Sequence, residues 1–330
     1  MIDKKVIVIA TGGTIAMKYD EASQGLIPAC SGADLAAAVP GLGDIAPLEF
    51  IQLSNIASCA MTPQNMWSLH NKIDEVLSRD DVAGVIVTHG TDTIEETSYF
   101  LDLVHSSDKP VILTAAMRGA ADTSPDGPMN IFCAVKAAAS EQTRGLGVLV
   151  CLNEMLHAPA EVTKTHSANP ATFESPWWGP IGYVDIDRVV IRRRPLQPVR
   201  FSPTSLTARV DIIKAMTGST RDYIDFAAQQ GCDGIIIEGF GRGNIPPAMV
   251  SGIAEAVQKG IAVVLTSRTL GGRVLDVYGY PGSVTETRRV GIAMGGEVSA
   301  AKARLKLMIA LSENPTKYRL QKELERIFDI

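Results

Sequence analysis

The sequence predicts a two-domain α/β protein, with a larger amino-terminal domain built on a doubly wound, mainly parallel sheet and a smaller carboxyl-terminal α/β domain. Short β-branched segments alternate with segments of helical period in both parts of the chain. Strand, helix and strand in that order favour parallel pairing through right-handed crossovers. The chain has 330 residues, which exceeds the usual size of one domain.

The first part of the chain supplies most of these alternating segments. Thr62 and Pro63 form a typical helix start, an N-cap residue followed by proline at the first helical position. We expect strands at 6–10, 49–53, 85–88, 111–115 and 147–152, and helices at 34–39, 66–78, 94–104 and 129–140.

A change of pattern near the middle of the chain indicates a domain boundary. Residues 183–194 alternate as in a hairpin, and Pro195, Pro198 and Pro203 follow close together. We therefore predict an amino-terminal domain over 1–190, a linker over 191–209 and a second domain over 210–330. In the second domain we expect strands at 210–214, 234–237 and 262–266, and helices at 220–229, 247–259 and 300–312.

The composition is that of a globular protein and gives no reason to expect a nucleic-acid or membrane partner. The apolar residues make up 46% of the chain, the charged residues 20%, and the net charge is -5. One basic cluster, Arg192 to Arg194, precedes Pro195, and we interpret it as a solvated linker.

Cysteine use and hydrophobic patterning indicate the cytoplasm. The five cysteines show no C-x-x-C pair, so a reducing compartment is the simpler interpretation. The apolar stretch after Lys5 is too short for a secretory signal, and no run reaches the length of a membrane span.

Two threonine-rich segments stand where apolar strand segments end, and they predict the active site. Thr11 to Thr14 follow the first strand, and Thr88 to Thr93 follow the third. Ligands of open α/β sheets bind beyond the carboxyl ends of the strands, so these hydroxyls can meet at one site. A threonine hydroxyl needs a neighbouring base to attack an acyl carbon, and Lys164, held by Asp92, is a candidate. Glycine-threonine turns are also common structural caps, and that alternative stays open for either segment alone.

Other chemistries fit the sequence less well. Gly12 and Gly13 permit close approach to an anion, but neither G-x-G-x-x-G nor a P-loop lysine follows the first strand. The five histidines show no metal-ligand spacing, so we expect no metal, and His89 is interpreted as shaping its turn. No G-x-S-x-G elbow occurs.

Taken together, these segments resemble the bacterial L-asparaginase family, in its cytoplasmic type I-like asparaginase or glutaminase form. The resemblance extends over essentially the whole chain. Its motifs are Ala10 to Ala16, Thr88 to Thr93 with Glu95 to Thr97, Lys109 to Val111, Ala116 to Arg118, Asp126 to Asn130, Val162 to Thr165 and Lys302 to Arg304.

The resemblance implies hydrolysis of the side-chain amide of L-asparagine to L-aspartate and ammonia, without a cofactor. It makes Thr14 the acyl-forming nucleophile and Thr91, Asp92 and Lys164 a second hydroxyl, carboxylate and lysine set. It also implies a homodimer or homotetramer in which the neighbouring subunit completes each site. The substrate-binding residues that it implies are Ser58, Cys59, Gly90, Thr91, Asp92, Ala116 and Asn244.

Some features are left open by the sequence. The preference among asparagine, glutamine and D-amides is open, as are the order in which the threonines attack and the choice of dimer or tetramer. Tyr19 is the only phenol near the expected lid, and Glu286 is close to the position of the family's partner-supplied glutamate. Asn244 also fits a helix N-cap before Pro247. An ammonia-donating amidotransferase subunit and a non-catalytic aspartate- or asparagine-binding protein remain alternatives.

Overall fold

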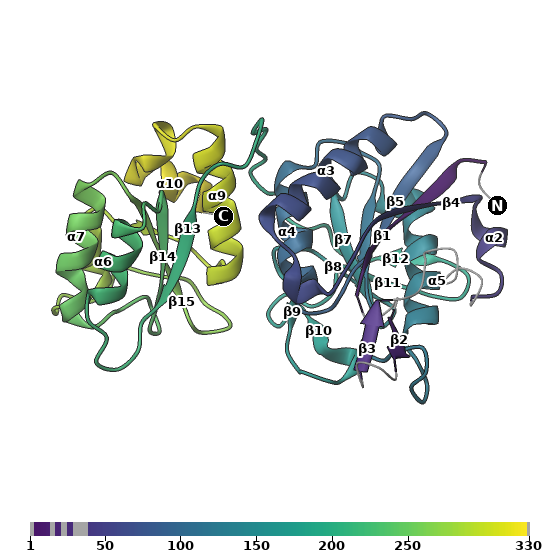
Figure 1. Cartoon of the computed structure of the whole chain (residues 1–330), viewed down its shortest axis with the longest axis horizontal. Coiled ribbons are helices and arrows are strands. Elements are labelled where there is room, and N and C mark those ends of the chain that lie inside the picture. Colours follow the sequence, from purple (N-terminus) through teal and green to yellow (C-terminus); the bar gives the residue numbers. More distant parts are fainter. Residues whose placement is uncertain (1–2, 14–16, 21–24, 29–38, 329–330) are drawn as a thin grey trace. The chain divides into compact units, whose positions relative to one another are not determined.

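The structure is a computed structural model that describes residues 3–13, 17–20, 25–28 and 39–328. The chain divides into two compact units, residues 1–200 and 201–330. Each unit is an α/β structure with its own sheet and its own helices (Figure 1). The predicted fold class is therefore confirmed in both parts of the chain.

The first unit is built on an eight-stranded sheet with the order β12-β11-β8-β7-β6-β5-β1-β4. Its five parallel strands are β4, β1, β5, β6 and β7, and the three antiparallel strands that follow β7 extend the sheet. Their bounds are β1 Lys5–Gly12, β4 Leu48–Ile56, β5 Val82–Thr88, β6 Val111–Thr114, β7 Val148–Leu152, β8 Met155–His157, β11 Gly182–Val184 and β12 Val189–Ile191.

Four α-helices and two small ladders complete the described part of this unit. Thr62 accepts a hydrogen bond from the Asn65 backbone and closes a capping box, which confirms the predicted helix start. The helices are α2 Leu42–Ile45, α3 Pro63–Leu77, α4 Ile94–Val104 and α5 Gly127–Ala138. The ladders pair β2 Met17–Asp20 with β3 Gly25–Pro28, and β9 Thr163–Lys164 with β10 Phe173–Glu174. Most of the helix expected over 34–39 lies outside the described residues.

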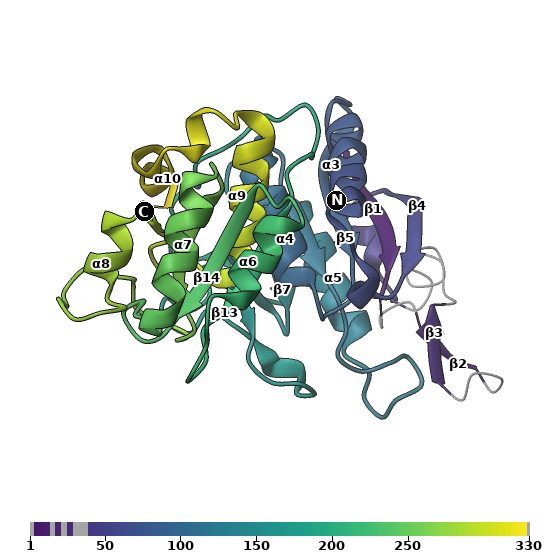
Figure 2. The ribbon, with the colours of Figure 1, turned by 60° about the vertical axis from the view of Figure 1, so that its left-hand side comes forward.

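One crossover in this sheet departs from the expected hand. Helices α3 and α4 contact each other, whereas α5 packs with α2. Helices α3 and α4 lie on one side of the strands and α2 and α5 on the other (Figure 1), and Figure 2 shows α4 and α5 from a second direction. Helix α4 joins β5 to β6, and α5 joins β6 to β7, so both crossovers advance along the sheet in the same direction. Because the two helices lie on opposite faces, the crossover through α5 has the hand opposite to that through α4. The expectation of uniformly right-handed crossovers was therefore wrong at this connection, where burial of the α5 side chains against the sheet outweighs the general preference.

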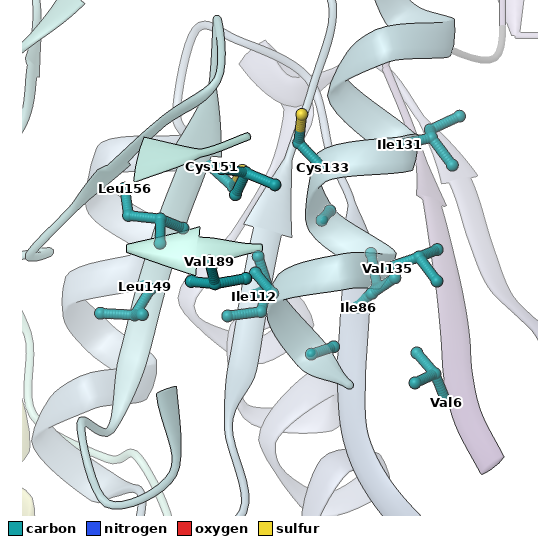
Figure 3. Packing of buried hydrophobic residues seen from close by; sticks show 14 of the residues in the cluster. Val6, Ile86, Ile112, Ile131, Cys133, Val135, Leu149, Cys151, Leu156 and Val189 are labelled. Atoms are coloured by element: carbon teal, nitrogen blue, oxygen red, sulfur yellow. The ribbon is translucent and has the colours of Figure 1, made fainter. Parts of the chain in front are cut away.

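The core on the α5 face explains that placement. Along β1 the cluster contains Val6 and Val8, and along β7 it contains Leu149 and Cys151, so each strand contributes every second residue. Helix α5 contributes Ile131 and Val135 to the same cluster (Figure 3). Burying such aliphatic side chains stabilises a protein by roughly 1.5–3 kcal/mol each.

The second unit contains a smaller parallel sheet with the order β13-β14-β15-β16. Helices α6 and α7 contact each other, and α9 packs along β13, β14 and β15. The strands are β13 Val210–Lys214, β14 Gly234–Gly239, β15 Ala262–Ser267 and β16 Ala293–Met294, and the helices are α6 Asp222–Gln229, α7 Val250–Gln258, α8 Val284–Arg289, α9 Ala300–Glu313 and α10 Gln321–Phe328. Its three expected strands and three expected helices are confirmed, whereas β16, α8 and α10 were not predicted.

Candidate active site

The site lies where the strand order of the first sheet reverses. From β1 the chain crosses to β4 on one side, and then to β5 on the other side of β1. Ligands of doubly wound sheets bind beyond the carboxyl ends of the strands at such a reversal, because the crossovers leave in opposite directions. The two threonine-rich segments begin at the carboxyl ends of β1 and β5, whose Ala10 and Thr88 are paired in register.

Glycines bring the strand exits into close contact. A Cβ built on Gly13 would lie 2.4 Å from the Gly90 nitrogen, and one on Gly90 would lie 2.5 Å from Ser58 Oγ. Gly13 also has a φ of +84°, a conformation that L side chains rarely adopt. The exits of β1 and β5 therefore meet backbone to backbone, and the exit of β5 meets the Ser58 side chain after β4, at distances that only glycine permits.

Thr91, Asp92 and Lys164 form a hydrogen-bonded group at this edge. The Lys164 Nζ donates to Thr91 Oγ1 at 3.0 Å and to Asp92 Oδ1 at 3.2 Å. The Thr91 residue is 7% exposed, and the Lys164 and Asp92 side chains are 21% and 60% exposed. A buried hydroxyl beside an amine, with a carboxylate facing solvent, is suited to proton transfer to a small ligand.

Ser58 joins the exit of β4 to this group. Its Oγ accepts a hydrogen bond from the Asp92 backbone N–H at 3.2 Å, and its carbonyl accepts one from Thr93 Oγ1 at 2.8 Å. Ser58 is buried, while the next residue, Cys59, is exposed. Ser58 thus lies directly against the loop that carries Asp92.

A buried histidine binds the backbone of the loop that follows β5. His89 is fully buried, and its Nδ1 lies 2.8 Å from the Gly90 carbonyl, which can only accept, so that nitrogen carries the proton. Burial lowers the pKa of His89 to about 4. The neutral ring therefore fixes the Gly90 carbonyl, in agreement with the interpretation that His89 shapes its turn.

Two residues that were not predicted as site residues, Asp126 and Asn130, hold the exit of β6 beside the predicted Ala116. Ala116 is buried, and the Asp126 carboxylate accepts the backbone N–H groups of Met117 and Arg118 at 3.0 and 2.8 Å. Asn130 donates to the Ala115 carbonyl at 2.9 Å. Asp126 and Asn130 belong to a segment that the sequence singled out only through the family resemblance, which gave neither residue a role.

The remaining predicted residues lie outside the described residues or belong to the second unit. Thr14 lies outside the described residues, and so does the side chain of Tyr19. Asn244 belongs to the second unit, and the helical segment after it begins at Pro247 with Pro246 as its N-cap residue. The N-cap alternative for Asn244 was therefore wrong. Glu286 caps its own turn, where its Oε2 accepts the Gly282 N–H at 2.6 Å.

Other candidate sites in the described part of the chain offer less chemistry. No group of His, Cys, Asp or Glu side chains suited to a metal ion occurs among the described residues. A surface pocket of about 360 Å³ lies at the amino-terminal edge of the first sheet, near Lys4, Pro110 and Arg144. Its one nearby hydroxyl, Ser140, already caps a 3-10 turn. Across the described segments, every helix falls short of the length and hydropathy that a bilayer span needs.

Comparison with known proteins identifies relatives along nearly the whole chain. The family model "Asparaginase, N-terminal" matches residues 5–197, and "Glutaminase/Asparaginase C-terminal domain" matches residues 209–327. An L-asparaginase of Bacillus licheniformis is 33% identical over 94% of this chain and 96% of its own length. A glutaminase-asparaginase of Pseudomonas fluorescens is 32% identical over 98% and 89%. A solved structure titled "Probable Cytoplasmic L-asparaginase from Campylobacter jejuni" superimposes with a TM-score of 0.87 at 31% identity, over 98% of this chain and 99% of that one.

Proposed function

This chain belongs to the asparaginase family and is an amidohydrolase, and we propose that it hydrolyses L-asparagine to L-aspartate and ammonia with threonine hydroxyls at the β1 and β5 exits. The observation that carries the proposal is the contact of Lys164 Nζ with Thr91 Oγ1 at 3.0 Å. An amine at that distance can take the proton of the hydroxyl when it is unprotonated. The resemblance drawn from the sequence and the geometry of the described residues therefore support the same chemistry.

The proposed reaction proceeds through an acyl-enzyme. The Thr14 oxygen forms a bond to the side-chain carbonyl carbon of asparagine, its proton passes to the leaving nitrogen, and the carbon–nitrogen bond breaks to release ammonia. Water then attacks the ester, giving aspartate and restoring the Thr14 hydroxyl. Thr91 and Lys164 form the relay that moves protons in these steps, and Asp92 holds the lysine amine.

The substrate is held by groups around the same loop. We assign Ser58, Asp92 and the neighbouring Cys59 to the α-carboxylate and α-amino end of the substrate. The backbone near Gly90, Thr91 and Ala116 faces the amide end, where N–H donors stabilise the negative oxygen that develops during attack. In other enzymes the loss of one such donor costs about 3–4 kcal/mol of transition-state stabilisation.

Ammonia release from L-asparagine by the purified chain tests this function. We expect turnover by the wild-type chain and its loss in Thr14→Ala and Thr91→Val, with unchanged circular dichroism. Near-normal turnover by one of these variants would remove that threonine from the mechanism. Parallel assays with L-glutamine, D-asparagine and buffer alone define the substrate range. An absence of ammonia with every amide, together with tight aspartate binding, would contradict catalysis.

We further propose that the enzyme acts in the cytoplasm as a homodimer or homotetramer whose neighbouring subunit supplies Asn244 to each site. The buried Oδ1 of Asn244 has no hydrogen-bond partner within the described part of this chain, so this acceptor is unsatisfied in the single chain. Light scattering gives the mass of the particle. A monomer with full activity would contradict the shared site.

A further inference from the structure

We propose that Glu95 is a positioning residue, which holds the backbone of Lys164 so that the lysine amine reaches Thr91. The inference rests on the function proposed above. Its basis is one hydrogen bond, from the Lys164 backbone N–H to Glu95 Oε2 at 3.0 Å. This bond joins residues that are 69 positions apart in the chain.

Lys164 needs such a support because its strand is short and separate. Strand β9 contains only Thr163 and Lys164, and it pairs with β10 in a two-stranded ladder outside the eight-stranded sheet. Thr91, in contrast, follows a central strand of that sheet. The sheet ladder that fixes Thr91 therefore does not fix Lys164.

Glu95 belongs to the same strand-to-helix junction as Thr91. It lies in the first turn of α4, which begins three residues after Thr91. A carboxylate there is favoured by the positive end of the helix, and its bond to an N–H group is charge-assisted. The Glu95 carboxylate thus holds the Lys164 backbone at a fixed distance from the strand-to-helix junction that carries the Thr91 hydroxyl.

Hydrogen bonds also anchor the two ends of the β9–β10 ladder, where the Val162 N–H donates to the Ala158 carbonyl at 3.0 Å and Ser175 Oγ lies 3.0 Å from His157 Nδ1, but they bind residues other than Lys164. Val162 is fully buried and Phe173 is 5% exposed, so packing keeps the ladder against the unit. Packing of this kind resists separation but tolerates small sliding movements, whereas a hydrogen bond sets a distance and a direction. The Lys164 side chain also has four rotatable bonds, so a displaced backbone gives its amine further freedom to move away from Thr91. Loss of Glu95 therefore displaces the amine while leaving the fold in place.

Removal of the Glu95 carboxylate should lower kcat more than it changes KM. We expect Glu95→Ala to lose about 10- to 100-fold in kcat, because a displacement near 1 Å is enough for such a loss. Glu95→Gln retains a side-chain oxygen that can accept the same N–H, so it should recover most of the activity. The matched control is Glu174→Ala, the same change at an exposed residue of the β9–β10 ladder, which should leave kcat unchanged.

Lys164→Met measured alongside separates failure of this inference from failure of the proposed mechanism. If Lys164→Met is inactive while folded Glu95→Ala keeps kcat within about twofold, the positioning role is wrong and the lysine mechanism stands. If folded Glu95→Gln is as inactive as Glu95→Ala, the hydrogen bond is not what matters and the inference fails. If Lys164→Met is fully active, the mechanism and this inference fail together. Thermal melts of each variant identify loss of folding.

Discussion

The two sheets of this protein use the same strand-helix-strand connections, yet they differ in strand order. In the first unit the chain starts at β1, moves to β4 on one side and then continues from β5 on the other, whereas the second unit adds β13 to β16 in sequence. Only the first order contains a reversal, where crossovers leave on opposite sides and open a crevice at the strand ends. Glycine-rich exits occur in both units, so the difference lies in topology and not in loop composition.

The contrast extends to the lysine-carboxylate pairs at the strand ends. In the first unit Lys164 contacts Asp92 and also the buried Thr91 hydroxyl. In the second unit Lys214, the last residue of β13, pairs with Glu238 at 2.9 Å. We take the first pair as catalytic and the second as a partly exposed ion pair of small energetic value.

The largest expected effect comes from replacing each of these two lysines with methionine, in two separate variants. Lys164→Met should lower kcat for ammonia release by about 10²- to 10⁴-fold, because methionine matches the length of the side chain but cannot take a proton. Lys214→Met should leave kcat within about twofold, since an exposed ion pair contributes little. Steady-state assays of both variants make the measurement. Equal losses of kcat in the two variants would contradict the proposal that the catalytic lysine is the one at the reversal of strand order.

A second difference concerns acid stability, because every histidine of the chain precedes residue 167. Burial lowers the pKa of His89, His105 and His157 to about 4, from 6.5 in the unfolded chain. The unfolded state therefore binds more protons between these values, and the free energy of unfolding falls as the pH falls from 6.5 towards 4. Each histidine accounts for about 3 kcal/mol over the whole interval. Burial raises the pKa of Asp102 to about 7, which acts in the opposite direction over a similar range but is one group against three.

Acidification from pH 7 to pH 5 should therefore lower the melting temperature of the first unit more than that of the second. Lys306 is a buried titratable group of the second unit, and burial lowers its pKa to about 8. It is therefore already mostly protonated at pH 7, and acidification to pH 5 changes its effect on the free energy of unfolding little. Trp67, Trp177 and Trp178 all lie in the first unit, so tryptophan fluorescence follows its unfolding selectively. An unchanged fluorescence midpoint between the two pH values would show that the histidines are not decisive. His166→Gln, at an exposed position, serves as the control.

The smallest expected effect is on the second unit alone. Lys306 is fully buried, and its Nζ has no hydrogen-bond partner among the residues described, although it lies 5.1 Å from the centre of the Phe328 ring. Lys306→Met should raise the free energy of unfolding of this unit by about 1–2 kcal/mol at pH 7, because it removes an unsatisfied buried amine. Calorimetry measures the shift, and asparagine turnover should stay the same. A lower melting temperature would mean that the amine has a stabilising partner.

Elements with a strong local pattern could be predicted from the sequence. Helix α4 occupies the expected range 94–104 and β13 the expected range 210–214. Strands of two or three residues, such as β9 and β16, carry too few side chains for a period to be recognised. The side on which α5 packs was also beyond prediction, because its apolar face fits either face of an apolar sheet.

For the candidate site, the sequence supplied residue types and the fold supplied distances. The threonine-rich exits of β1 and β5 were recognisable because they follow apolar strands. The role of Glu95 was not, because its partner is a backbone N–H of a distant residue, and a main-chain donor leaves no trace in the sequence of side chains.

By itself the sequence determined the fold class, the positions of the main strands and helices, and the chemistry available at two strand ends. These follow from local periodicity and residue type, which act over a few neighbouring positions. Only the tertiary structure decided that Lys164 contacts Thr91, that Ser58 supports Asp92, and that α5 covers the face opposite to α4. Such contacts join segments far apart in the chain, and they form because burial of the apolar faces fixes the strand order that brings the polar loops together.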